Sequence, residues 1–180
     1  MRRLALLVAL CGCASAGTPE DTTAKPDVIF TGADRGTLMT DGARPLEASI
    51  AATPAAVWEV TKKIYAQFEV PVTLDNPLGH QLGNKSFYKM RTMAGKPLQD
   101  LVNCGMGMDG PKAAKYRVFM SLVTSVNPDG KGGTTIQTTL VASGVDISAG
   151  AGSDRVVCGS SGVLEYLLNE KVSAALAKGH

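Results

Sequence analysis

The chain has 180 residues, of which 44% are hydrophobic and 19% are charged, and its formal net charge is +2. This length accommodates one globular domain with a buried core and excludes a miniprotein held together by disulfides alone. No apolar run reaches the roughly 18 residues that a membrane-spanning helix needs.

Residues 1–12 have the pattern of a secretory signal peptide. Arg2 and Arg3 precede an apolar run from Leu4 to Leu10, and small residues follow. Without these two arginines the basic residues number 18 − 2 = 16, equal to the 16 acidic residues. A mature chain of zero net charge has no general attraction for phosphate backbones, so we do not expect nucleic-acid binding.

The end of this segment carries a second motif, Leu10-Cys11-Gly12-Cys13. It resembles the lipobox of bacterial lipoproteins, with leucine three residues and glycine one residue before the cysteine that receives lipid. The resemblance implies cleavage after Gly12, acylation of Cys13 and attachment to the membrane of a bacterial cell envelope. Ala14 after that cysteine favours delivery to the outer membrane, facing the periplasm, in a host with two membranes. The alternative is a plain secreted protein with a cysteine near its cleavage site.

Residues 13–26 are the predicted lipidated cysteine followed by a small, polar segment punctuated by proline, which is typical of a flexible tether. A coil of this length spans about 20 Å. We expect residues 27–180 to form a single globular α+β domain held just off the lipid surface.

The first half of this domain contains one strongly predicted helix. Thr53 followed by Pro54 is typical of a helix start, and apolar residues then recur at intervals of three and four through Phe68. Around it the alternation of apolar and polar residues predicts strands. These are a hairpin at Asp27–Thr31 and Gly36–Met39, and strands at Leu46–Ile50, Val70–Leu74, Gln81–Leu82 and Phe87–Met93.

In the second half, one or two helical turns are predicted at Pro97–Asn103 and a loop at Gly105–Pro111. Long alternating segments at Tyr116–Val126 and Thr134–Val145 flank a turn rich in glycine and predict a long antiparallel hairpin. A short strand at Arg155–Cys158 precedes a terminal amphipathic helix that follows Gly162. Glu165 near the start of this helix and Lys178 near its end suit the helix dipole.

Together these segments predict an α+β fold: a curved antiparallel sheet of roughly six to eight strands packed on two amphipathic helices. The order of elements from Ala48 to Asn84 is similar to the repeating unit of the BamC-type outer-membrane assembly lipoproteins. Shared features are the helix that begins at Thr53-Pro54 with Trp58 early in it, the exit through Val70-Pro71-Val72, and Asp75 before a glycine-containing turn. The resemblance implies a helix-grip architecture.

Two of the four cysteines, Cys104 and Cys158, remain after Cys11 leaves with the signal peptide and Cys13 is lipidated. An isolated pair in an oxidising compartment is most simply a disulfide. A reactive thiol and a metal ligand are the alternatives, although no histidine lies near either cysteine in the sequence.

The sequence holds few residues suited to catalysis or metal binding. His80, in a turn near Asp75, and His180, the last residue, are the only histidines, and no glycine-rich phosphate-binding loop is present. Soft sulfur atoms in Cys104, Met106 and Met108, with Met90 and Met93 nearby, could hold Cu(I), but methionines often fill cores and a disulfide-bonded cysteine has no thiolate. We therefore predict no catalytic residues, no metal and no cofactor.

A helix-grip sheet can enclose an apolar cavity between the sheet and its helix. Trp58, Tyr65, Tyr116 and Met120 are the residues expected to line such a pocket, and each is equally suited to a packed core. We expect a lipid-anchored envelope protein that is not an enzyme, with an interaction or scaffolding role toward other envelope proteins at the membrane surface. The alternative is a carrier of a hydrophobic small molecule or lipid, and an enzyme comes third.

Overall fold

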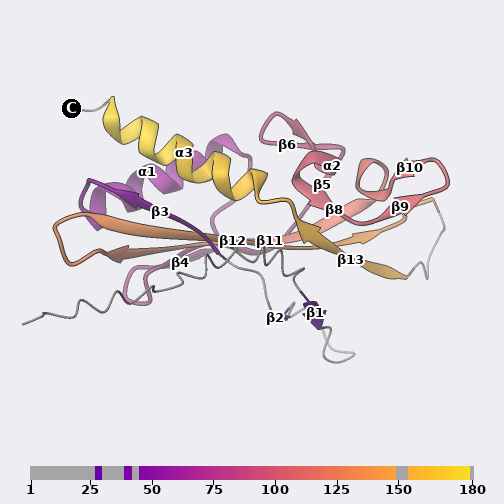
Figure 1. Cartoon of the computed structure of the whole chain (residues 1–180), viewed down its shortest axis with the longest axis horizontal. Coiled ribbons are helices and arrows are strands. Elements are labelled where there is room, and N and C mark those ends of the chain that lie inside the picture. Colours follow the sequence, from indigo (N-terminus) through magenta and orange to yellow (C-terminus); the bar gives the residue numbers. More distant parts are fainter. Residues whose placement is uncertain (1–26, 30–38, 42–44, 149–153, 179–180) are drawn as a thin grey trace, which may run out of the picture.

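Figure 1 shows the computed structural model, which describes residues 27–29, 39–41, 45–148 and 154–178. The predicted signal peptide (1–12), Cys13 with the tether (13–26), and His180 lie outside the described residues. None of the helices in the described part of the chain has the length and apolarity needed to cross a bilayer.

The main sheet has seven antiparallel strands in the order β4-β5-β11-β12-β13-β8, and β3 pairs with β12 along the edge that β13 also uses. The strands are β3 (Leu46–Ile50), β4 (Leu74–Asn76), β5 (Gln81–Met90), β8 (Val102–Asn103), β11 (Arg117–Pro128), β12 (Thr134–Val145) and β13 (Arg155–Ser160).

Helices α1 (Pro54–Gln67) and α3 (Val163–Ala177) lie against each other on one face of this sheet (Figure 1). A single helical turn, α2 (Leu98–Leu101), lies at the other end of the same face. The N-terminus of α1 forms as predicted, because the Thr53 side chain accepts a hydrogen bond from the Ala56 N–H at 3.4 Å and Pro54 is the first helical residue.

Short two-stranded pieces complete the fold. They are β1 (Asp27–Ile29) with β2 (Met39–Asp41), β6 (Thr92–Met93) with β7 (Lys96–Pro97), and β9 (Met106–Gly107) with β10 (Gly110–Pro111), followed by the 3₁₀ turn η1 (Lys112–Ala114). In Figure 1 the β1–β2 hairpin lies on the side of the sheet opposite the helices.

The predicted α+β class is confirmed: a large antiparallel sheet is packed on helices. The predicted strand at 70–74 is wrong, because the chain joins the ladder only at Leu74. Pro71 has no N–H to donate, and its carbonyl accepts a hydrogen bond from the side chain of Asn84 instead. The two strands predicted around residues 81–93 are one strand that ends at Met90, where Arg91 takes a positive φ.

A buried chain of hydrogen bonds connects both long helices to the sheet. The hydroxyls of Tyr65 and Thr124 are 3.1 Å apart, and those of Thr124 and Thr138 are 3.0 Å apart. Thr138 donates to Oδ1 of Asn169 at 2.8 Å, and Nδ2 of Asn169 donates to the carbonyl of Leu46 at 3.1 Å. Because Thr138 gives its proton to Asn169, it accepts from Thr124. The Tyr65 hydroxyl donates to the carbonyl oxygen of Leu122 at 3.2 Å.

We expect Tyr65→Phe to lower the free energy of unfolding by about 1–2 kcal/mol, because the carbonyl of Leu122 and the hydroxyl of Thr124 each lose a buried hydrogen-bond partner while the ring volume is kept. Denaturant titration measures this loss. Tyr166→Phe removes an exposed hydroxyl from α3 and is the matched control. Equal stability of the two variants would contradict a stabilising role for the buried chain.

Cys104 and Cys158 form the predicted disulfide, with their Cα atoms 4.1 Å apart. The bond continues the register of β8 and β13, in which Asn103 lies opposite Gly159. It reinforces the pairing of β13 with β8, the strand by which the segment 92–115 rejoins the sheet.

The two cysteines are 54 positions apart in the sequence, a separation for which loss of the cross-link costs about 4 kcal/mol in the chain-entropy model. We expect a thiol reductant to lower the denaturation midpoint of the protein. The double variant Cys104→Ser/Cys158→Ser should already have the lower midpoint and should not respond to reductant. A midpoint that reductant leaves unchanged in the unsubstituted protein would refute this prediction.

Candidate functional site

The face of the sheet opposite the helices carries a row of side chains that crosses four strands. Tyr88 of β5 lies opposite Phe119 of β11, Phe119 opposite Ser143 of β12, and Ser143 opposite Val157 of β13. Residues directly opposite in an antiparallel ladder project from the same face. Val118 and Met120, on either side of Phe119, are buried on the helix side, so this row belongs to the other side, here called the outer face.

Two arginines lie over the aromatic rings of this row. The guanidinium of Arg117 is 5.1 Å from the ring centroid of Tyr88, and that of Arg155 is 4.6 Å from the centroid of Phe119. The two rings are 6.1 Å apart and tilted by 53°. These four residues form a continuous unit, which we name the arginine–aromatic cluster.

The cluster is accessible to solvent and positively charged. Tyr88 is 57% exposed, both arginines are exposed, and Phe119 is half-buried. Within the described ranges neither arginine is in an ion pair, since the salt bridges found there involve Lys62, Lys89 and Lys115. An arginine stacked on a ring keeps the N–H groups at its edge free to donate to an anion.

Ser143 lies in the same row and is fully buried, and its hydroxyl has no hydrogen-bond partner among the described residues. An unpaired buried hydroxyl is unfavourable. A carboxylate on another part of the outer face has a neutral partner, because Glu47 of β3 accepts a hydrogen bond from Gln137 at 2.9 Å. Gln137 is six residues from Ser143 along β12, or about 20 Å.

The four residues predicted to line a pocket lie in three different surroundings. Tyr65 and Met120 are buried in the core between sheet and helices. Trp58 is half-buried on α1 and donates a hydrogen bond from Nε1 to Asp75 at 3.1 Å. Tyr116 lies over Gly144, where an added Cβ atom would come within 3.0 Å of its ring.

Two open hollows lie at other positions on the surface. One, of about 370 Å³, lies at the end of α1 and is lined by Lys62, Ala66, Glu69, Val70, Pro71 and Val72. The other, of about 300 Å³, lies between β3 and the last turns of α3. Neither includes any of the four predicted lining residues.

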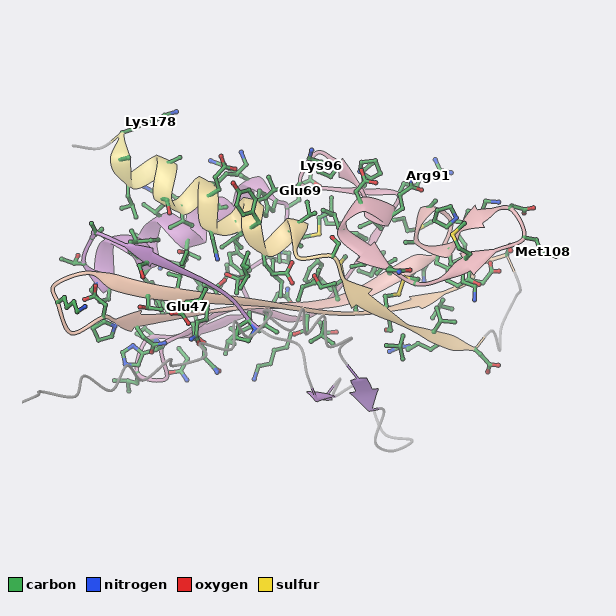
Figure 2. The ribbon with its side chains drawn as sticks, in the orientation of Figure 1. Glu47, Glu69, Arg91, Lys96, Met108 and Lys178 are labelled. Carbon is green, nitrogen blue, oxygen red and sulfur yellow. A yellow bond between two sulfur atoms is a disulfide. The ribbon has the colours of Figure 1, made fainter. Side chains whose placement is uncertain are left out.

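The sulfur atoms considered for Cu(I) are not gathered at one place. Cys104 is in the disulfide, and Met93 is buried in the core. Met106 is 70% exposed, and Met108 is fully exposed at the end of the molecule distant from α3 (Figure 2). In the described part of the chain, no three His, Cys, Asp or Glu side chains come together as a metal site.

His80 lies exposed in the turn between β4 and β5, as the sequence predicted. Asp75, the carboxylate considered as its partner, instead contacts Trp58 and Lys62, at 3.1 and 3.7 Å.

The comparisons with known proteins give no family to guide the interpretation of this site. No protein-family model matches the chain, and no curated protein is detectably similar to it in sequence.

The buried carboxylate of Glu165 lies beside a short stretch of β12 that is paired with neither β3 nor β13. β3 pairs with β12 as far as Thr138, and β13 begins to pair at Ala142, which leaves the N–H of Leu140 between them. Glu165 accepts a hydrogen bond from the hydroxyl of Ser160 at 2.6 Å, and the nearby N–H of Leu140 also favours its charged form. Burial raises the pKa of Glu165 despite these donors, and its Oε2 atom has no partner among the described residues. From the sequence, the only role predicted for Glu165 was a favourable interaction with the dipole of the terminal helix.

We expect Glu165→Gln to change how stability depends on pH. Because the folded-state pKa lies above the unfolded value, this group stabilises the fold at low pH, and that contribution is lost as pH rises through the folded pKa. The amide keeps an acceptor for Ser160 and Leu140 but never ionises. Between about pH 4 and pH 8, the free energy of unfolding should therefore fall less in the variant than in the unsubstituted protein.

Denaturant titrations across this pH range measure the difference. Glu170→Gln, at an exposed position on the same helix, is the control and should leave the slope unchanged. An unaltered slope in Glu165→Gln would show that the buried carboxylate does not titrate in this range.

Proposed function

We propose that this chain is a lipid-anchored protein of the bacterial cell envelope, with a non-catalytic interaction or scaffolding role at the membrane surface. The lipobox at Leu10–Cys13 supports the anchor, and its sequence context favours the periplasmic face of an outer membrane. The disulfide supports an oxidising compartment, because such bonds persist mainly in secreted and envelope proteins.

The observation that carries the interaction role is the exposed arginine–aromatic cluster. Arginine and tyrosine are enriched among the residues that dominate binding at interfaces, and here two arginines and two rings meet on one sheet face. On the helix side the same sheet is covered by a packed core that includes both Tyr65 and Met120. The surface suited to a contact at the membrane is therefore the outer face.

The anchor is tested by the intact mass of the protein purified from its native envelope. We expect a chain that begins at Cys13 and carries additional acyl mass, and we expect it in the detergent-soluble membrane fraction. Cys13→Ser should abolish the acylation, because one nucleophilic sulfur accepts the lipid, and high salt without detergent should then release the domain from the membrane fraction.

Cys11→Ser is the matched control, since Cys11 would leave with the signal peptide, and it should not alter the mature mass. A mature chain that begins elsewhere, or one without acyl mass, would refute the anchor. A small hydrophobic molecule found by native mass spectrometry in stoichiometric amount would favour the carrier function over scaffolding.

A further inference from the structure

We infer that the arginine–aromatic cluster is a second membrane contact, which binds the phosphate headgroups of anionic phospholipids. The outer face of the sheet then lies against the bilayer that holds the lipid anchor. The placement of this contact rests on the anchoring proposed above, whereas the headgroup chemistry rests on the cluster itself.

The charges of the cluster favour an anionic ligand. Arg117 and Arg155 both lie opposite Val145, on the two strands that flank β12, so their backbones are about 10 Å apart. Neither is paired with a carboxylate in the described part of the chain. Each planar guanidinium presents paired N–H donors, which match two phosphate oxygens. The attraction is local, since the mature chain as a whole has no net charge.

The apolar groups around the arginines favour a lipid interface over a purely polar ligand. Tyr88 is 57% exposed and presents a ring with a polar tip, the type of side chain enriched at the level of the headgroups. Ile147, just beyond the end of β12, is 47% exposed, and Met90 and Val157 are partly exposed on the same strands as the cluster residues. Arginines beside exposed aromatic and aliphatic side chains are typical of surfaces that lie in the membrane interface.

The position of the N-terminal end of the domain is compatible with this orientation. The β1–β2 hairpin, which begins at Asp27 directly after the predicted tether, lies on the outer-face side of the sheet in Figure 1. A tether of about 20 Å keeps the outer face at a high effective concentration near the bilayer. Weak headgroup contacts are then sufficient to hold it there. A second copy of the chain is a poorer occupant, because two such arginine pairs would repel each other across a symmetric contact.

The test uses the mature chain with Cys13→Ser, which cannot be acylated, so that any binding comes from the domain. Sedimentation with vesicles is compared between pure phosphatidylcholine and a mixture with phosphatidylglycerol. We expect binding only to the anionic vesicles, and weaker binding as salt is raised. In this background, Arg117→Gln/Arg155→Gln should reduce the vesicle partition coefficient about thirtyfold, since each basic residue near such a surface contributes about a factor of five.

The matched control is Lys96→Gln/Lys178→Gln, which removes the same charge from exposed positions on the helix side (Figure 2). The vesicle partition coefficient of this control should fall by less than about twofold if only the outer face contacts the bilayer. All four substituted side chains are exposed, and thermal unfolding verifies that each variant is folded.

Equal losses in the two double variants, or no binding of the unsubstituted domain to anionic vesicles, would overturn the inference. Capture of an acidic protein by the cluster without vesicle binding would also overturn it. Vesicle binding that depends on the cluster, found together with an unacylated Cys13 in the native protein, would refute the anchor and leave the headgroup contact standing.

Discussion

The register of the central hairpin is fixed by the buried hydrogen-bond chain that runs from Tyr65 through Thr124, Thr138 and Asn169 to the carbonyl of Leu46. Polar groups buried in a core must be paired, so both threonines have to project toward the helices. A slip of one residue in either strand would turn a threonine outward and leave Tyr65 or Asn169 without its partner. The core therefore selects one pairing of β11 with β12.

The same register determines what the outer face presents. With Thr124 and Thr138 directed inward, alternation directs Phe119 and Ser143 outward, opposite each other in the ladder. Gly83 allows the close approach on which this arrangement depends, because a Cβ atom there would lie 2.3 Å from the carbonyl oxygen of Leu122 and 3.0 Å from the hydroxyl of Tyr65. The set of side chains on the outer face is therefore a consequence of how the core strands are paired.

Local patterns were sufficient to predict the elements whose signals are contained in a few consecutive residues. The start of α1 at Thr53 and the long hairpin are of this kind, whereas the disulfide was predicted from the cysteines that the lipobox leaves over. The turns at Arg91 and Ala94 could not be predicted, because a positive φ at a non-glycine residue has no sequence signature. The arginine–aromatic cluster was also missed, since its residues come from three strands and meet only through long-range register. Tyr65 was expected between the helix and the sheet. Its hydrogen-bond partners on β11 could not be predicted, because they also depend on the long-range pairing of the strands.

An acyl anchor and a flexible tether attach a domain to a bilayer but leave its orientation free. Headgroup contacts by Arg117 and Arg155 would select one orientation, with the outer face toward the lipid and α1 and α3 directed away from it. The segment 92–115, with exposed Met106 and Met108, is held to the sheet by the disulfide and would keep a fixed position in that orientation. The cluster would then determine which surface of the anchored domain other envelope proteins meet, whereas the proposed lipid alone would determine where the domain resides.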